Sequence, residues 1–423
     1  MLEKNYTAIG EKIYATRLPN GLEIRVISKP EHAKACAFFV TKYGGMDLRF
    51  QLNGQWQDTP AGIAHYLEHK MFDTEDGNAL QELAQQGAEP NAFTSNAITA
   101  YYFYSTEHFY DNLKILLSFV SVPYFTKESV EKEQGIIGQE IRMIEDGPDW
   151  QIYTQLMQCL YEKSPARISV AGTVESISHI TAETLYDCHK AFYNPSNMVL
   201  CVVGNVDPEK VAEIAAEVLP EEGGEEIKRD YAQETSPEPA CREAKRNMEV
   251  SMPQFLAGYK CDPPASGMEH FRMGMIGDMA CDILYGDSSP LYSRLYEEGL
   301  INDTFGGSFD ILPGAAYVYV GGDTNDPHKV HEAITAEAER LVREGIDEEF
   351  YQRIRRSSYG QMIRSLNSFE VIAIAAAEGI FDGFDYYSFP EVFETITKAD
   401  VEEFLRKNIT AQRTAISLIY PTK

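Results

Sequence analysis

Two histidines and a glutamate stand close together in a stretch that follows Thr59, where the sequence contains the pattern H-x-x-E-H. Thr59 is a favourable N-cap and Pro60 suits the first helical position, so a helix is predicted to begin there. On that helix His65 and His69 lie one turn apart on one face, with Glu68 on the same side. Two imidazoles beside a carboxylate can offer zinc two ligands and a reacting water a base. Without a third ligand, the histidines would more simply be structural residues.

A second helix is predicted to carry two further glutamates on its apolar face. It follows the N-cap Thr126, and its apolar residues recur at helical spacing at Val130, Ile137, Ile141 and Ile144. Glu133 and Glu140 fall within this stripe. Burying two carboxylates is costly unless a metal ion or hydrogen-bond donors receive them. Either glutamate could therefore be the third ligand, and the spacing alone leaves the choice open.

The segment between these helices, residues 91–104, is rich in threonine and aromatic residues and is predicted to form two adjacent strands. Tyr101 and Phe103 are most simply explained as part of a sheet core. Residues Ala92–Ser95 could form an edge strand beside the first helix, to which an extended peptide could add through main-chain hydrogen bonds. The sequence thus suggests a peptide-binding edge next to the candidate metal site.

The remaining sequence indicates two similar halves. A β-hairpin is predicted across Ile13–Lys29 and a further strand at Ala35–Tyr43, before the H-x-x-E-H helix. A helix–turn–strand unit that begins at Ile180 recurs from Ile396, which favours two copies of one domain.

These patterns predict an α+β fold of two homologous domains, each a mixed, mostly antiparallel sheet with helices packed on one face. We expect an N-terminal domain with the metal site at residues 1–222 and a C-terminal domain without one at residues 247–423. Residues 223–246, which are rich in Glu, Gly and Pro, are predicted to be a polar linker between them.

Composition narrows the class of protein. A chain of 423 residues with 44% hydrophobic residues is typical of a folded protein with more than one core, and its net charge of −28 argues against nucleic-acid or anionic-membrane partners. We find no signal peptide and no apolar run long enough to span a membrane. The seven cysteines are scattered and never form C-x-x-C, which predicts reduced, mostly buried thiols in a cytoplasmic protein rather than a disulfide framework.

Jointly, these motifs resemble those of peptidase family M16, the pitrilysin-like or insulinase-like zinc peptidases, whose metal motif is the inverzincin H-x-x-E-H. The chain is most similar to short bacterial members that resemble the mitochondrial processing peptidase. The matching motifs are G-x-x-H-x-x-E-H from Gly62, N-A-x-T-S-x-x-x-T-x-Y from Asn91, the glutamates at 133 and 140, G-T-x-E-S-I from Gly172, and N-P-S-N-M from Asn194.

The resemblance implies a zinc ion bound by His65, His69 and Glu140, and so it decides between the two glutamates. It implies that Glu68 is the catalytic base that activates the attacking water, and that Glu133 is an active-site carboxylate that orients a histidine ligand. It also implies that substrate adds to the edge strand, where the contacting residues would be Asn91, Ala92, Phe93 and Thr94. The expected activity is zinc-dependent endoproteolysis of unstructured peptides.

One feature of active M16 members is missing from the second half. They usually carry an Arg and a Tyr in a pattern like S-R-L-F-x-x-x-R-x-x-x-G-L-x-Y. The corresponding stretch, Ser288–Asn302, is one residue shorter and places Tyr296 at the arginine position or Asn302 at the tyrosine position, depending on the alignment. Arg294 lies nearby in the wrong register and is most simply a surface residue.

Some short bacterial members are heterodimers in which one chain carries zinc and the other carries the Arg/Tyr pair. We therefore expect this chain to be the zinc-bearing subunit, with a homodimer or a lone monomer as alternatives. A further alternative is a non-catalytic scaffold or assembly subunit on the same fold. Degenerate relatives of that type usually lose zinc ligands, whereas this sequence keeps all three ligands and the base.

Overall fold

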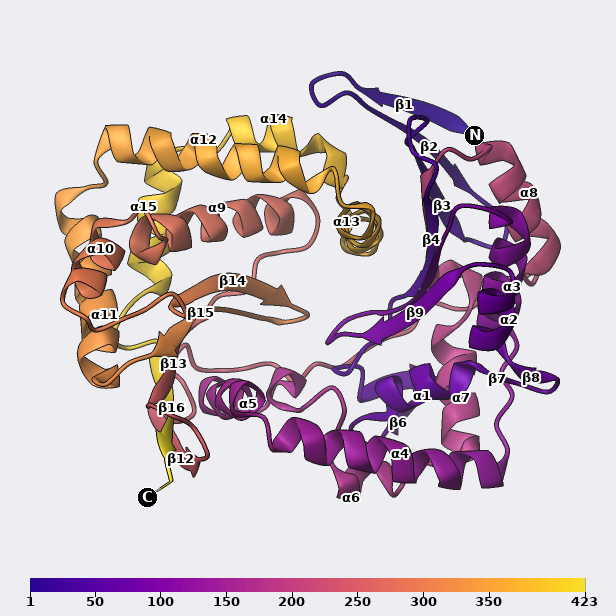
Figure 1. The fold of residues 1–423 in the computed structure, drawn as a ribbon, viewed down its shortest axis with the longest axis horizontal. Coiled ribbons are helices and arrows are strands. Elements are labelled where there is room, and N and C mark those ends of the chain that lie inside the picture. Colours follow the sequence, from indigo (N-terminus) through magenta and orange to yellow (C-terminus); the bar gives the residue numbers. More distant parts are fainter. Residues whose placement is uncertain (423) are drawn as a thin grey trace. The chain divides into compact units, whose positions relative to one another are not determined.

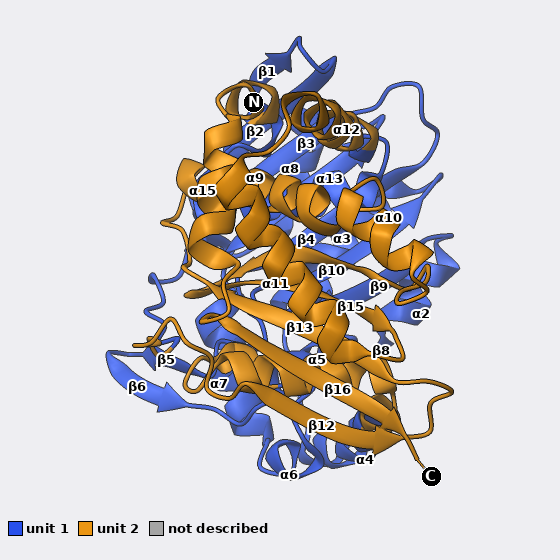
Figure 2. Ribbon diagram, turned by 90° about the vertical axis from the view of Figure 1, so that its left-hand side faces the viewer, with its two compact units in different colours: residues 1–141, 169–231, 365–388 blue, residues 142–168, 232–364, 389–423 orange. Residues whose placement is uncertain are grey.

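The computed structural model describes residues 1–422, and the chain divides into two compact units (Figure 2). Unit 1 contains residues 1–141, 169–231 and 365–388, and unit 2 contains residues 142–168, 232–364 and 389–423. The units therefore differ from the contiguous segments expected from the sequence, because each includes a helix-bearing segment from the other half of the chain.

Unit 1 is built on a seven-stranded sheet in the order β1-β2-β3-β11-β4-β10-β9. Neighbouring strands are antiparallel except for the parallel pair β3 and β11. Among the described residues, strand β9 forms one edge of the sheet and pairs with β10 alone. The strands are β1 Leu2–Tyr6, β2 Glu11–Arg17, β3 Glu23–Ser28, β4 Ala35–Thr41, β9 Glu89–Thr94, β10 Thr99–Ser105 and β11 Met198–Gly204; two small hairpins are β5 Arg49–Leu52 with β6 Gln55–Asp58, and β7 Asp73–Thr74 with β8 Gly77–Asn78.

Helices cover both faces of this sheet, whereas the sequence predicted helices on one face only, because a helix from the other half of the chain packs on the second face. Helix α3, with α2 and α8 beside it, lies on one face, and α13 packs on the other against β4 and β11 (Figure 1). Every residue of β4 and β11 is buried, as expected for central strands covered on both sides. The helices of unit 1 are α1 Ile63–Met71, α2 Ala79–Gln85, α3 Phe109–Ser121, α4 Lys127–Glu145 (whose last turn belongs to unit 2), α6 Val174–Ile177, α7 Ala182–Phe192, α8 Pro208–Val218 and α13 Phe369–Asp382.

Unit 2 has a five-stranded sheet in the order β12-β16-β13-β15-β14. Helix α5 packs on one face, against β12, β13 and β16, and α9, α11 and α15 lie on the other (Figure 1). The strands are β12 Glu243–Met248, β13 Gln254–Cys261, β14 Gly306–Leu312, β15 Ala315–Asp323 and β16 Thr414–Pro421; the helices are α5 Pro148–Leu160, α9 Met268–Tyr285, α10 Pro290–Glu297, α11 Pro327–Glu344, α12 Glu348–Ser365, α14 Phe389–Glu394 and α15 Lys398–Asn408.

The two sheets share one topology, which confirms the prediction of two homologous domains, each with a mixed, mostly antiparallel sheet. The order β3-β11-β4-β10-β9 in unit 1 corresponds to β12-β16-β13-β15-β14 in unit 2, and the first pair is parallel in both. The repeated helix–turn–strand unit is also present in both, because α7 and α15 each begin with a threonine capping box, at Thr181 and Thr397.

Two local predictions were wrong. Helix α1 begins at Ile63 rather than after Thr59, because Gly62 at φ 92° forms its N-cap and the Thr59 hydroxyl instead donates to the carbonyl of Leu48 (3.1 Å). The end of the predicted linker forms strand β12, which pairs with β16. No helix among the described residues is long and apolar enough to cross a membrane.

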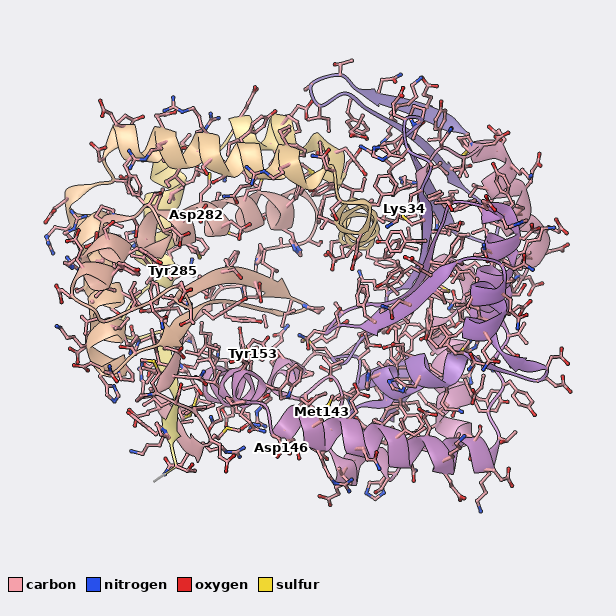
Figure 3. The ribbon with its side chains drawn as sticks, in the orientation of Figure 1. Lys34, Met143, Asp146, Tyr153, Asp282 and Tyr285 are labelled. Carbon is pink, nitrogen blue, oxygen red and sulfur yellow. A yellow bond between two sulfur atoms is a disulfide. The ribbon has the colours of Figure 1, made fainter. Side chains whose placement is uncertain are left out.

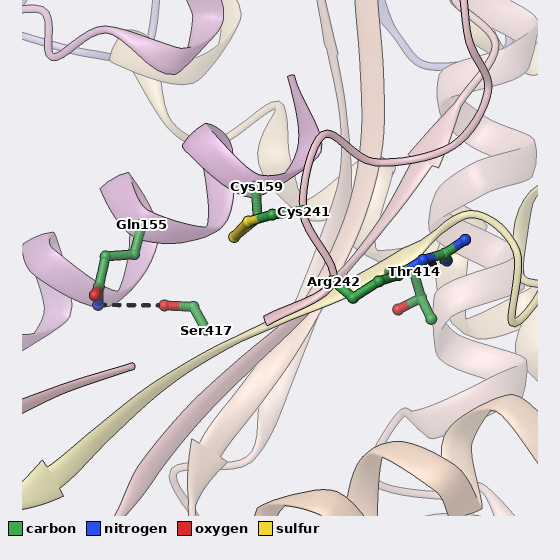
Figure 4. The surroundings of a disulfide bond; sticks show 6 residues. All are labelled: Gln155, Cys159, Cys241, Arg242, Thr414 and Ser417. Atoms are coloured by element: carbon green, nitrogen blue, oxygen red, sulfur yellow. Dashed lines mark hydrogen bonds between the residues drawn. A yellow bond between two sulfur atoms is a disulfide. The ribbon is translucent and has the colours of Figure 1, made fainter. Parts of the chain in front are cut away.

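The prediction that all cysteines are reduced was also wrong. Cys159 on α5 and Cys241, just before β12, form a disulfide, with their Cα atoms 4.6 Å apart (Figure 4). The pattern of cysteines could not reveal this pair, since 82 residues separate its members and only folding brings them together. The other five cysteines are free and buried, as expected: Cys36, Cys188, Cys201, Cys261 and Cys281.

Candidate functional site

Helix α1 is held beside the edge of the unit 1 sheet by contacts around its first turn. Gly62 lies so close to the carbonyl of Ala171 that a Cβ atom would be 2.5 Å from its oxygen, and the Ser176 hydroxyl donates to the carbonyl of Ala61 (2.7 Å). The Tyr66 hydroxyl donates to the carbonyl of Val130 on α4. These contacts explain why glycine is needed at the start of the motif, and they fix α1 against α4.

His65 and His69 lie on the same side of α1, with ring centroids 4.7 Å apart. Both are half-buried, whereas Tyr66 and Leu67 on the other side of the helix are fully buried. The structure therefore places the two imidazoles next to each other at the surface of unit 1, as the helical spacing predicts.

Helix α4 brings both glutamates to these histidines, but the two glutamates contact different ring nitrogens. Glu140 Oε1 is 3.5 Å from His65 Nε2, and Glu140 Oε2 is 3.5 Å from His69 Nε2. Glu133 Oε1 instead lies 3.2 Å from Nδ1, the other ring nitrogen of His69. Glu140 thus lies between the two Nε2 atoms, and Glu133 contacts the outer side of one imidazole.

The donor set His65, His69 and Glu140 fits a zinc ion. One ligand atom from each residue lies within 4.8 Å of the others. Among the described residues, no other group of three or more His, Cys, Asp or Glu side chains meets this condition. Two imidazole nitrogens and a carboxylate oxygen suit zinc and leave a fourth tetrahedral position open. Glu133 matches the carboxylate that often accepts from the second nitrogen of a metal-binding histidine.

Burial and neighbouring charges shift the pKa values of these groups. Burial, reinforced by the charge of His69, lowers the pKa of His65 to about 4 and so favours the neutral imidazole that a metal requires. Burial opposes protonation of His69, but its hydrogen bond with Glu133 and the charges of Glu68 and Glu140 raise its pKa overall. Burial raises the pKa of Glu68, which the hydrogen bond from Thr94 partly offsets.

Glu68 lies on α1 between the metal cluster and the edge strand. Its side chain is 8% exposed, and its Oε2 atom accepts a hydrogen bond of 2.6 Å from the hydroxyl of Thr94 on β9. Thr94 in turn is 3.3 Å from the hydroxyl of Thr99 on β10. The sequence placed Glu68 and Thr94 in the same region, but no sequence signal predicted the bond between them.

The residues expected to contact a peptide lie on the edge strand. Asn91 is exposed, Ala92, Phe93 and Thr94 are half-exposed, and the Ala92 amide donates to Asn91 Oδ1 (2.8 Å). That amide points away from β10, so it is available at the sheet edge if the Asn91 side chain turns aside. Tyr101 and Phe103, by contrast, are fully buried in the sheet core, in agreement with their simpler interpretation.

The stretch that lacks the Arg/Tyr pattern lies in unit 2. Arg294 and Tyr296 are on α10, where both are exposed, and the Tyr296 ring stacks on Tyr292 with centroids 6.0 Å apart. Asn302 lies in the following loop, and its Oδ1 atom accepts from the amide and the hydroxyl of Thr304. None of these three residues belongs to the cluster of unit 1.

Family comparisons agree with these features. Residues 53–174 match the family described as "Insulinase (Peptidase family M16)", and residues 179–358 match the "Peptidase M16 inactive domain". The first match contains α1, β9 and α4, and therefore all of the candidate site. The second begins before β11 and covers most of unit 2, which contains no candidate metal cluster among its described residues.

Individual relatives cover nearly the whole chain. The "Uncharacterized zinc protease YmfH" of Bacillus subtilis (strain 168) is 39% identical and spans 98% of both sequences. The crystal structure of an M16-like peptidase from Alicyclobacillus acidocaldarius has a TM-score of 0.93 and 32% identity, covering 97% of this chain and 99% of that one. A protease from Helicobacter pylori shares the fold, with a TM-score of 0.82 at 20% identity.

Proposed function

This chain belongs to peptidase family M16, and on that premise we propose that it is a zinc-dependent endopeptidase that cleaves unstructured peptides. The observation that carries the proposal is the convergence of His65, His69 and Glu140 beside a buried carboxylate, Glu68, and an unpaired strand edge. A scaffold protein would need none of these features, and the desolvation of so many ionisable groups would be a cost without benefit.

The residues of the cluster would divide the work. His65, His69 and Glu140 would hold the metal, while Glu133 would keep His69 in the orientation that presents Nε2. When bound, a zinc ion would lower the pKa of water and polarise the carbonyl of the scissile bond. Glu68 would take a proton from the attacking water and pass it to the departing amine.

The edge strand would bind the peptide. Strand β9 has a free edge within reach of α1, so an extended peptide could pair with its main chain and bring a peptide bond to the cluster. Such pairing requires an extended segment with free amides and carbonyls. Unstructured peptides should therefore be cleaved in preference to folded proteins.

We further propose that a second chain completes the active site. Arg294, Tyr296 and Asn302 do not reproduce the family's Arg/Tyr pattern, and charge stabilisation of the developing oxyanion normally requires such donors. A homologous subunit that carries the Arg/Tyr pair would supply them. A homodimer or a monomer with weak activity is the alternative.

The Glu68→Gln variant tests the mechanism. It should retain about one zinc ion per chain in elemental analysis, because glutamine replaces the base and not a ligand. Its kcat/KM on an unstructured fluorogenic peptide should fall by about 10²–10⁴-fold. Glu82→Gln, an exposed change on α2, is the matched control. Undiminished cleavage by the zinc-loaded Glu68→Gln variant would rule out this mechanism, and absence of zinc from the wild type would favour a scaffold.

A further inference from the structure

The hydroxyl of Thr94 is one of the closest polar partners of the proposed base. Its 2.6 Å hydrogen bond ends on Oε2 of Glu68, and the other carboxylate oxygen, Oε1, accepts no hydrogen bond from the described residues. A hydrogen bond to a charged group contributes more than one between neutral groups and is more sensitive to direction. Thr94 therefore distinguishes the two oxygens of the carboxylate.

The direction of the Thr94 hydroxyl is itself constrained. Thr99 is fully buried on β10 directly opposite Thr94, and its hydroxyl lies 2.9 Å from the carbonyl of Tyr43 and 3.3 Å from Thr94 Oγ1. Because Glu68 as a carboxylate can only accept, the Thr94 proton must point to it. Thr99 has a single hydroxyl proton, which the nearer carbonyl of Tyr43 (2.9 Å) takes in preference to Thr94 Oγ1 (3.3 Å), so the Thr94 hydroxyl is oriented by its hydrogen bond to Glu68.

Thr94 lies on the strand that would bind the peptide. Thr94 and Ala92 lie on the same face of β9, since side chains alternate along a strand. Strand β9 is held on its inner side by β10, and its outer side is the free edge. Strand β9 would thus position both partners of the reaction: the peptide through its free edge, and the Glu68 carboxylate through Thr94.

We propose that Thr94 is the positioning residue of Glu68. Its hydroxyl fixes the carboxylate relative to strand β9, so that the base and a peptide paired with β9 are both held in a defined position relative to that strand. The proposal rests on the proposed peptidase function. It assigns to the Thr94 side chain a role in orienting the base, whereas the family resemblance of the sequence implied only that Thr94 contacts substrate. Sub-ångström placement of a base is worth orders of magnitude in rate, so the effect should appear in kcat.

The substitutions Thr94→Val and Thr94→Ser separate shape from hydrogen bonding. Valine keeps the volume of threonine without the donor, and serine keeps the donor without the methyl group. Thr94→Val should lower kcat by about 10–100-fold, the loss expected for one hydrogen bond to a charged group. KM, zinc content and the unfolding midpoint should stay close to those of the wild type, and Thr94→Ser should retain kcat within about threefold.

A crystal structure provides a readout that does not depend on activity. In the wild type and in Thr94→Ser the Glu68 carboxylate should adopt one orientation, and in Thr94→Val it should rotate or occupy more than one. An unchanged Glu68 orientation in Thr94→Val would overturn the proposal, as would a rise in KM without a fall in kcat, which would mark Thr94 as a substrate contact. A rotated Glu68 in a protein that cleaves no peptide even after a homologous chain with the Arg/Tyr pair is added would refute the proposed function and leave the positioning role standing.

Discussion

His69 is specified on both sides of its ring. Nδ1 lies 3.2 Å from Glu133, and Nε2 lies 3.5 Å from Glu140. Each ring nitrogen is therefore contacted by a different glutamate of α4. A carboxylate at Nδ1 favours the tautomer with hydrogen on that nitrogen, which leaves the lone pair of Nε2 free for a metal. At the scale of single residues, the site therefore depends on Glu133 as well as on the three candidate ligands, because Glu133 selects the tautomer of His69.

The Glu133→Gln substitution should weaken zinc binding by about 10–100-fold, because the amide aligns and polarises His69 less strongly than a carboxylate. Competition with a chelator of known affinity measures the effect. Glu131→Gln changes an exposed glutamate two positions away on α4 and should leave the affinity unchanged. Equal affinities of the two variants would show that Glu133 does not support the metal site.

At the scale of elements, α5 is held on the sheet of unit 2 by close packing, hydrogen bonds and a disulfide. Leu156 and Leu160 pack so closely on β13 that a Cβ atom at Gly258 would lie 2.8 Å and 2.9 Å from their methyl carbons. The hydroxyls of Tyr153, labelled in Figure 3, and Tyr317 are 2.6 Å apart, and Gln155 Nε2 donates to Ser417 Oγ (3.5 Å; Figure 4). The disulfide to Cys241 adds a covalent link at the C-terminal end of the helix.

Loss of that disulfide should lower the stability of unit 2. Breaking a link between residues 82 positions apart restores chain entropy to the unfolded state, typically about 2–4 kcal/mol. For a unit of this size, the Cys241→Ser variant should unfold about 5–10 °C below the oxidised wild type in calorimetry.

A phosphine reductant provides the control. It should lower the midpoint of the wild type to that of Cys241→Ser and should not affect the variant. Alkylation before and after reduction gives a second check, because burial raises the pKa of Cys36, Cys188, Cys201 and Cys261 to about 12 and makes these thiols poorly reactive. A wild type that alkylates at Cys241 without reduction would contradict the disulfide.

At the scale of the whole molecule, one α/β topology occurs twice, and only unit 1 carries the candidate metal cluster among the described residues. In the C-terminal half, the stretch Ser288–Asn302 does not reproduce the family's Arg/Tyr pattern, since Tyr296 stands at the arginine position or Asn302 at the tyrosine position, depending on the alignment. Our proposal that another chain supplies donors for the developing oxyanion follows from this combination of a candidate metal cluster and an incomplete Arg/Tyr pattern.

The purified chain should therefore cleave an unstructured peptide weakly or not at all, and addition of a homologous chain with the Arg/Tyr pair should raise kcat by about 10²-fold or more, the usual effect of an oxyanion donor. Titration of one chain against the other should reach a maximum at equimolar amounts. The Glu68→Gln form of this chain, mixed in the same way, is the control for contaminating peptidases. Full activity of the single chain would contradict dependence on a partner.

The sequence by itself determined features that are encoded within short segments. The i, i+4 spacing of His65 and His69, the stripe that contains Glu133 and Glu140, and the strands β9 and β10 follow from local hydrogen-bond periodicity and side-chain alternation. The repeated helix–turn–strand unit likewise revealed the duplication. Each of these patterns can be recognised without knowing which segments lie side by side.

Only the tertiary structure decided which distant groups meet. The bond between Glu133 and His69 spans 64 residues, that between Thr94 and Glu68 spans 26, and the disulfide spans 82. The start of α1 at Gly62 depends on the approach of Ala171, and the exchange of α5 and α13 between the halves depends on which sheet face each helix covers. Such contacts are set by the packing of whole elements, because a segment's own sequence fixes its periodicity but not its neighbours.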